Sequence, residues 1–95
     1  MDINQEDKEN LYELIGKIKI NVVLYFGGSN VDKETNQDFI KQIHKYTSEG
    51  LISDIDCVRL TDILDKIIIG FFDIEIPMAR ENILDIVNEI QKKYE

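Results

Sequence analysis

The sequence predicts an all-α fold, an antiparallel four-helix bundle made by one acidic helical domain over residues 1–95. Two observations support this prediction. Apolar residues recur at spacings of three and four positions in four segments, and glycine, serine or proline separates these segments. Each segment covers about 15 to 20 residues, or roughly 22 to 30 Å of helix, so the four helices could pack side by side.

The first helix is predicted from about Asp7 to Phe26. Acidic residues occupy its first turns, where the helix dipole favours negative charge. Gly27 and Gly28 follow, and glycine tolerates the positive φ that commonly ends a helix. Spacings of four, three, four and four predict its buried face: Leu11, Ile15, Ile18, Val22 and Phe26.

The second helix is predicted from Asp32 to Ser48, before Gly50. Its predicted buried residues are Phe39, Ile40, Ile43 and Tyr46. Ser53 is a natural N-cap for the third helix, since a serine hydroxyl can accept a hydrogen bond from an unpaired backbone N–H. The apolar residues of that helix form a broad stripe: Val58, Leu60, Ile63, Leu64, Ile67, Ile68 and Phe71.

Pro77 suits the first turn of a fourth helix, because the missing N–H of proline would have had no partner at that position. The predicted buried face of this helix consists of Met78, Ile83, Ile86, Val87 and Ile90.

An alternative α+β fold has a small two-stranded sheet from residues 17–26 and 71–76. In both segments apolar residues alternate strictly with others, which is the pattern of a strand. We favour the helical fold because a two-stranded ribbon is marginally stable alone and no third strand is visible.

The chain is strongly acidic, with 19 acidic and 11 basic residues and a formal net charge of −8. A negative surface repels nucleic acid and anionic lipid, and it attracts basic proteins. The N-terminal residues lack the features of a secretory signal, and no apolar run approaches the ~20 residues of a membrane span. We therefore expect a cytoplasmic protein with a basic protein partner and without direct contact to nucleic acid or membrane.

No motif predicts catalysis, a metal or a cofactor. Cys57 is the only cysteine and His44 the only histidine, so an internal disulfide is excluded and a zinc site lacks ligands. Asp54 and Asp56 resemble the start of a calcium loop, but Arg59 stands where that loop needs glycine. The glycines of residues 27–30 lack the lysine and spacing of a P-loop. We expect a protein that is not an enzyme.

Negative charge is concentrated between Glu49 and Glu75, a segment with seven acidic residues, two basic residues and a net charge of −5. The third predicted helix and its flanking loops would thus form an acidic face. The predicted partner-binding residues are Asp54, Asp56, Asp62, Asp65, Asp73 and Glu75.

The segments Leu60-Thr-Asp-Ile-Leu-Asp-Lys-Ile, Phe71-Phe-Asp-Ile and Ala79-Arg-Glu-Asn-Ile-Leu-Asp-Ile-Val resemble the last two helices of bacterial toxin-immunity proteins of the colicin D type. Those proteins are small, acidic and helical, and they block a nuclease toxin domain. The resemblance implies an immunity or antitoxin role, in which acidic side chains occlude the active or RNA/DNA-binding groove of a basic toxin. It covers the C-terminal part of the chain only, and no functional residue is transferred from it.

Two other functions remain open at this point. The chain could be a phage-encoded inhibitor or nucleic-acid mimic that targets a host defence nuclease, which would have the same electrostatics. It could also be a small regulatory or structural homo-oligomer, with a self-contact through Tyr25, Phe26 and Phe72. The sequence does not define the oligomeric state.

Overall fold

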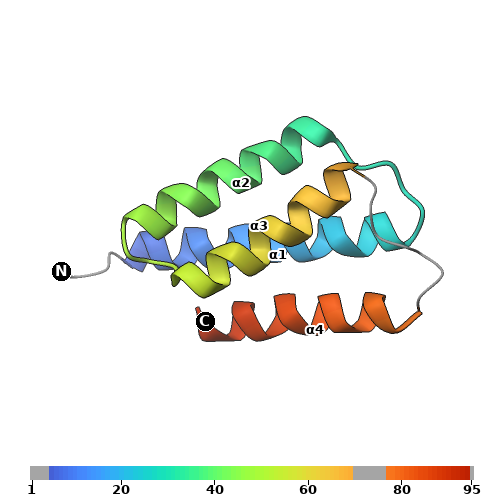
Figure 1. The fold of residues 1–95 in the computed structure, drawn as a ribbon. Helices are drawn as coiled ribbons and strands as arrows, with labels where there is room; N and C mark the ends of the chain where they lie inside the picture. Colours follow the sequence, from blue (N-terminus) through green and yellow to red (C-terminus); the bar gives the residue numbers. More distant parts are fainter. Residues whose placement is uncertain (1–4, 70–76, 95) are drawn as a thin grey trace.

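The chain forms four α-helices: α1 (Gln5–Phe26), α2 (Lys33–Ser48), α3 (Asp54–Ile69) and α4 (Pro77–Lys93). The computed structural model describes residues 5–69 and 77–94, with the side chains of the second stretch from residue 82 onward. Consecutive helices run in opposite directions, and the N-terminal end of α1 and the C-terminal end of α4 lie at the same end of the molecule (Figure 1). α2 packs mainly on α3, and α1 packs mainly on α4. The predicted all-α bundle is confirmed.

The alternative sheet is wrong for residues 17–26, which are helical, and residues 71–76 lie outside the described part of the chain. The alternating pattern in α1 consists of two series with a spacing of four. Ile18 and Val22 are buried, whereas Ile20 and Leu24 are exposed. Residues four apart share one face of a helix, so a helix with apolar residues on two faces can mimic the period of a strand.

The ends of the helices follow the predicted local signals. Gly28 has φ 87° directly after α1, and Gly50 has φ 79° after α2. Asp32 caps α2, because its carboxylate accepts hydrogen bonds from the Glu34 N–H at 3.2 Å and the Thr35 hydroxyl at 2.8 Å. These bonds fix where α2 begins relative to the preceding turn.

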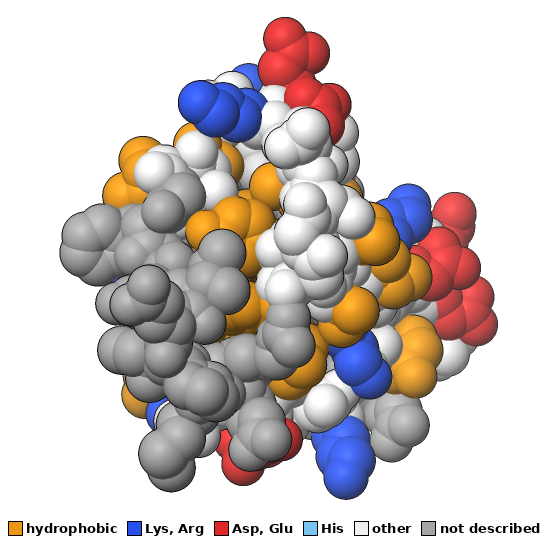
Figure 2. All heavy atoms as spheres, turned by 90° about the vertical axis from the view of Figure 1, so that its right-hand side faces the viewer, with side chains coloured by type: hydrophobic (Ala, Val, Ile, Leu, Met, Phe, Trp, Pro, Cys, Tyr) orange, Lys and Arg blue, Asp and Glu red, His pale blue; other side chains and the backbone are white. Residues whose placement is uncertain are grey.

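The core runs between the four helices. All five residues predicted to be buried in α1 are buried. Val58 is exposed, so its predicted place in the core is wrong, while Phe71 and Met78 lie outside the described side chains. Viewed from the end that holds the α1–α2 turn, apolar side chains show between charged side chains that project at the rim (Figure 2). The described buried apolar residues are Leu11, Leu14, Ile15, Ile18, Val22, Phe26, Phe39, Ile43, Ile52, Cys57, Leu60, Ile63, Leu64, Ile67, Ile83, Val87 and Ile90.

One polar contact crosses the core between α1 and α2. The Asn21 side-chain amide donates a hydrogen bond to Asn36 Oδ1, and Asn36 Nδ2 donates to the Asp32 carbonyl oxygen at 2.9 Å. Asn36 is fully buried, so both of these bonds are needed to offset the desolvation of its amide. The pair fixes the position of α2 along α1.

None of the described helices combines the length and the apolar character that a bilayer span requires.

Candidate partner-binding surface

α3 carries four of the six acidic residues predicted to bind a partner. Asp54, Asp62 and Asp65 are exposed to solvent, as predicted, while Asp56 is buried. Asp73 and Glu75 lie outside the described residues.

Asp56, predicted to be a partner contact, is held inside the molecule. Its side chain is 2% exposed. Its carboxylate accepts a hydrogen bond from the Tyr94 hydroxyl at 2.9 Å. It also forms an ion pair with Lys93, with 3.2 Å between Oδ1 and Nζ. The negative charge of Asp56 is thus used to attach the C-terminal end of α4 to the first turn of α3.

Tyr94 completes the N-cap of α3. Ser53 Oγ accepts a hydrogen bond from the Asp56 N–H at 3.2 Å, which is the expected cap. In a capping box the side chain three residues after the cap would bind the backbone N–H of the cap residue. Here the Ser53 N–H donates to Tyr94 Oη at 3.3 Å, and the same hydroxyl donates to Asp56. The tyrosine hydroxyl relays the bond, so this second half of the cap forms only when α4 is in place, whereas the bond to Ser53 Oγ is local.

The pKa of Asp56 reflects this environment. Burial of the carboxyl acts to raise its pKa, but hydrogen bonds from Tyr94, Ser53 and Lys93 and the charge of Lys93 outweigh burial and lower the pKa below its usual value. Burial, together with the neighbouring Asp56, raises the pKa of Tyr94, against the lowering effect of its bonds to Ser53. At neutral pH the pair is therefore a carboxylate and a protonated phenol.

The outward face of α3 combines apolar and acidic side chains in one line. The side chains of Ile55, Val58 and Ile69 are 67%, 65% and 71% exposed. Asp62 and Asp65 lie between Val58 and Ile69, and spacings of three, four, three and four from Ile55 onward place all five residues on one helix face. We call these residues the outer α3 stripe: Ile55, Val58, Asp62, Asp65 and Ile69.

Charge is not uniform along the outer α3 stripe. Asp62 forms an exposed ion pair with Lys66, with 3.0 Å between Oδ2 and Nζ, and an exposed pair of this kind contributes little to stability. Along the stripe, the two carboxylates of Asp62 and Asp65 lie between the aliphatic side chains of Val58 and Ile69. Sequence reasoning located the acids but placed Val58 in the core and overlooked Ile55, although their spacing from Asp62 and Asp65 follows a heptad.

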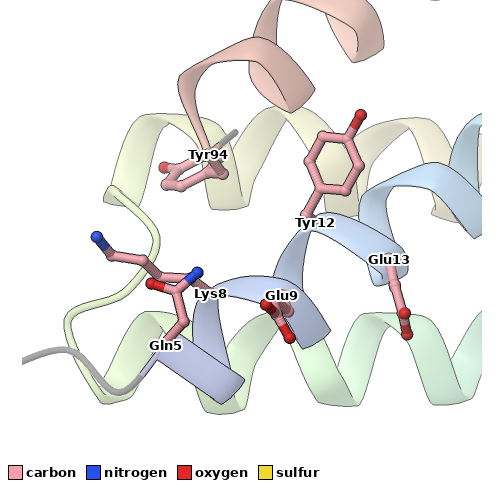
Figure 3. Close-up of a pocket in the computed structure, with 6 residues that line it drawn as sticks. All are labelled: Gln5, Lys8, Glu9, Tyr12, Glu13 and Tyr94. Carbon is pink, nitrogen blue, oxygen red and sulfur yellow. The ribbon is translucent and has the colours of Figure 1, made fainter.

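A shallow depression of about 370 Å³ lies where the start of α1 meets the end of α4. The Tyr12 ring comes from α1 and the Tyr94 ring from the residue directly after α4, and Lys8 and Glu9 extend from α1 beside them (Figure 3). Because Tyr94 is bonded to Asp56, its ring is held in place. The depression adds aromatic surface to the end of the bundle where α3 begins.

The structure brings together two residues that no sequence spacing connected. His44 Nδ1 lies 3.8 Å from Cys57 Sγ, across the contact between α2 and α3. Cys57 is buried, and its thiol lies within the contact between α2 and α3. Neither Cys57 nor His44 lines the depression described above. His44 is exposed.

Among residues 5–69 and the described side chains of α4, no three histidine, cysteine, aspartate or glutamate side chains gather closely enough to hold a metal ion. Comparisons with models of protein families, with curated proteins and with solved structures found no match to this chain.

Proposed function

We propose that the chain is an immunity or antitoxin protein that binds a basic nuclease toxin domain through the outer α3 stripe and occludes its active or RNA/DNA-binding groove. The observation that supports this proposal most directly is the exposure of Ile55, Val58 and Ile69 in line with Asp62 and Asp65. In this role the chain inhibits by steric and electrostatic blockade and catalyses no reaction itself.

The chemistry of the stripe matches the requirements of a protein interface. Aliphatic side chains that leave water on binding supply most of the affinity, at about 25 cal/mol per Å² of apolar area. The carboxylates of Asp62 and Asp65 would meet lysine or arginine side chains of the partner, which otherwise contact phosphate groups. The net charge of −8 would speed the encounter with a positively charged partner.

The fold also holds the stripe in a fixed position. Buried residues of α3 such as Leu60, Leu64 and Ile67 anchor the opposite face of the helix. The bonds among Ser53, Asp56 and Tyr94 fix its first turn. A rigid surface loses little conformational entropy on binding, which favours affinity.

The test compares two variants with the same change in charge. Asp62→Lys/Asp65→Lys alters the outer α3 stripe, and Asp85→Lys/Glu89→Lys alters exposed residues four apart on α4. Each changes the formal net charge from −8 to −4. Immobilised wild-type chain is used to capture its partner from the native cell, the partner is identified and purified, and its nucleic-acid cleavage is measured with and without each variant.

The proposal predicts a partner that is a basic nuclease, complete inhibition by the wild-type chain, and a loss of association rate for the α3 variant that exceeds the loss for the α4 variant at low salt. A partner without nuclease activity would refute the immunity role. Equal losses for the two variants would refute the outer α3 stripe as the binding surface.

A further inference from the structure

A second apolar surface lies on α1, outside the core and separate from α3. The side chains of Tyr12, Ile20, Val23 and Leu24 are 38%, 61%, 49% and 47% exposed. They border a shallow groove of about 480 Å³, which we call the outer α1 groove. The residues that line it are Tyr12, Gly16, Lys19, Ile20, Val23, Leu24 and Gln91.

The apolar character of this groove is not required by the bundle. The buried series of α1 already supplies its contacts with the other helices, so polar residues would serve equally well at positions 20 and 24. Single exposed apolar residues are ordinary on protein surfaces, but several gathered around a groove indicate a contact surface.

The charges of α1 indicate what kind of helix could cover the groove. From Gln5 to Glu13 there are four acids (Glu6, Asp7, Glu9, Glu13) and one base, a net charge of −3. From residue 14 to Phe26 the charged residues are Lys17 and Lys19, a net charge of +2. A second α1 in the antiparallel direction would place each acidic half beside a basic half, whereas a parallel arrangement would place like charges together.

We propose that two copies of this chain associate through their outer α1 grooves, as an antiparallel α1–α1 pair with the two-fold axis close to Gly16. Glycine at the crossing lets the two backbones approach closely. A side chain at position 16 would meet the flexible Gln91 amide, with 3.3 Å between the added Cβ and Nε2. Around this axis Glu13 faces Lys17 of the second copy along one edge of the contact, and the Tyr12 ring faces Lys19 along the other.

The pairing uses the same patch on both copies, as a two-fold contact requires. Ile20 lies about one helical turn from the axis, opposite Tyr12 of the second copy, and supplies apolar contact on both sides of the axis. The outer α3 stripe is on another helix, so this inference is independent of the proposed function. It replaces the self-contact first suggested for Tyr25, Phe26 and Phe72: Phe26 is buried, Tyr25 packs edge-on against it at 5.6 Å between ring centroids, and Phe72 lies outside the described residues.

The oligomeric state of the purified chain tests the proposal. A contact through one helix per copy is small, so we expect a dissociation constant in the micromolar range, on the order of 10 to 100 μM. Sedimentation velocity across about 1 to 500 μM covers this range. Ile20→Glu should leave the chain monomeric throughout, and the matched variant Ile69→Glu, at an equally exposed isoleucine of α3, should dimerise as the wild type does.

A charge exchange tests the antiparallel direction. Glu13→Lys and Lys17→Glu should each raise the dissociation constant by roughly ten-fold, since each places like charges together twice in the two-fold contact. The double variant Glu13→Lys/Lys17→Glu should restore dimerisation, and circular dichroism confirms that each variant is folded.

Three results would overturn the inference. The wild-type chain could remain monomeric at the highest concentration. Ile69→Glu could disrupt the dimer as strongly as Ile20→Glu, which would place the contact on α3. The double exchange could fail to recover the dimer, which would exclude the antiparallel arrangement of α1.

Discussion

Replacement of Tyr94 by phenylalanine removes one oxygen atom that connects α3 with the end of α4. The ring and its packing are kept, but two hydrogen bonds are lost: the bond to the buried Asp56 carboxylate at 2.9 Å and the bond from the Ser53 N–H at 3.3 Å. A hydrogen bond to a charged group contributes about 1.5 to 3 kcal/mol, and a neutral one about 0.5 to 1.5 kcal/mol. We expect Tyr94→Phe to lower the free energy of unfolding by about 2 to 4 kcal/mol, a large part of the ~5 to 15 kcal/mol of a natural domain.

Urea unfolding followed by circular dichroism at pH 7 measures this loss. With a slope of about 2 kcal/mol per molar urea, the midpoint should fall by roughly 1 to 2 M. Tyr12→Phe is the matched control, because this tyrosine is partly exposed on α1, and its effect should stay within about 0.5 kcal/mol. A loss below about 1 kcal/mol for Tyr94→Phe would refute the relayed cap.

The pH dependence gives an independent check on the same group. The pKa of Asp56 is lowered in the folded protein, so its contribution to stability is complete above the unfolded pKa of about 3.9 and is lost as the pH falls through the folded pKa. Removal of the Tyr94 hydroxyl takes away one cause of the lowered pKa. The difference in stability between wild type and Tyr94→Phe should therefore shrink as the pH falls below about 4, and a constant difference would contradict the assignment.

Two further predictions concern the interior. Asn36→Ala should cost about 1 to 3 kcal/mol in urea unfolding, because it removes a fully buried amide bonded to Asn21, whereas Asn10→Ala on the exposed side of α1 should change little. Val58→Ser should alter stability by less than about 0.5 kcal/mol and Leu60→Ala by about 2 to 5 kcal/mol, although both residues belong to the apolar stripe predicted for this helix. Similar costs at positions 58 and 60 would contradict the orientation of α3.

Local signals defined the helices because capping and chain reversal depend on a few adjacent residues. Asp32 and Ser53 act as N-caps, and Gly28 and Gly50 have the positive φ that ends a helix. Pro77 is the first residue of α4, as its missing N–H predicts. These features are set by the chemistry of each residue and its immediate neighbours, and they could be predicted without knowledge of the packing.

The strand-like alternation in α1 arises because this helix carries apolar residues on two faces, of which only one is buried. Ile18 and Val22 are apolar because they lie in the core, whereas Ile20 and Leu24 are apolar on the outside. A one-dimensional pattern cannot distinguish an interior apolar residue from one on an exposed contact surface. Only the packed structure separates the two series and shows the outer α1 groove.

The orientation of α3 could not be predicted for a related reason. Its sequence has apolar residues around most of the helix, so several rotations would bury a similar area. Packing against α2 and α4 selects the rotation that buries Leu60 and Leu64, and this rotation turns Val58 outward and Asp56 inward. Asp56 can be buried because Tyr94 and Lys93, far away in the sequence, supply its partners.

The sequence alone thus determined the four helices, their caps, the net negative charge and the concentration of acids on and around α3. Tertiary structure decided which of the described acids of α3 are exposed and which one is buried, and it brought His44 beside Cys57 and Asn21 beside Asn36 across helix contacts. The reason is physical: helix formation depends on interactions within about four residues, while burial and the pairing of a charge depend on groups brought together from distant parts of the chain.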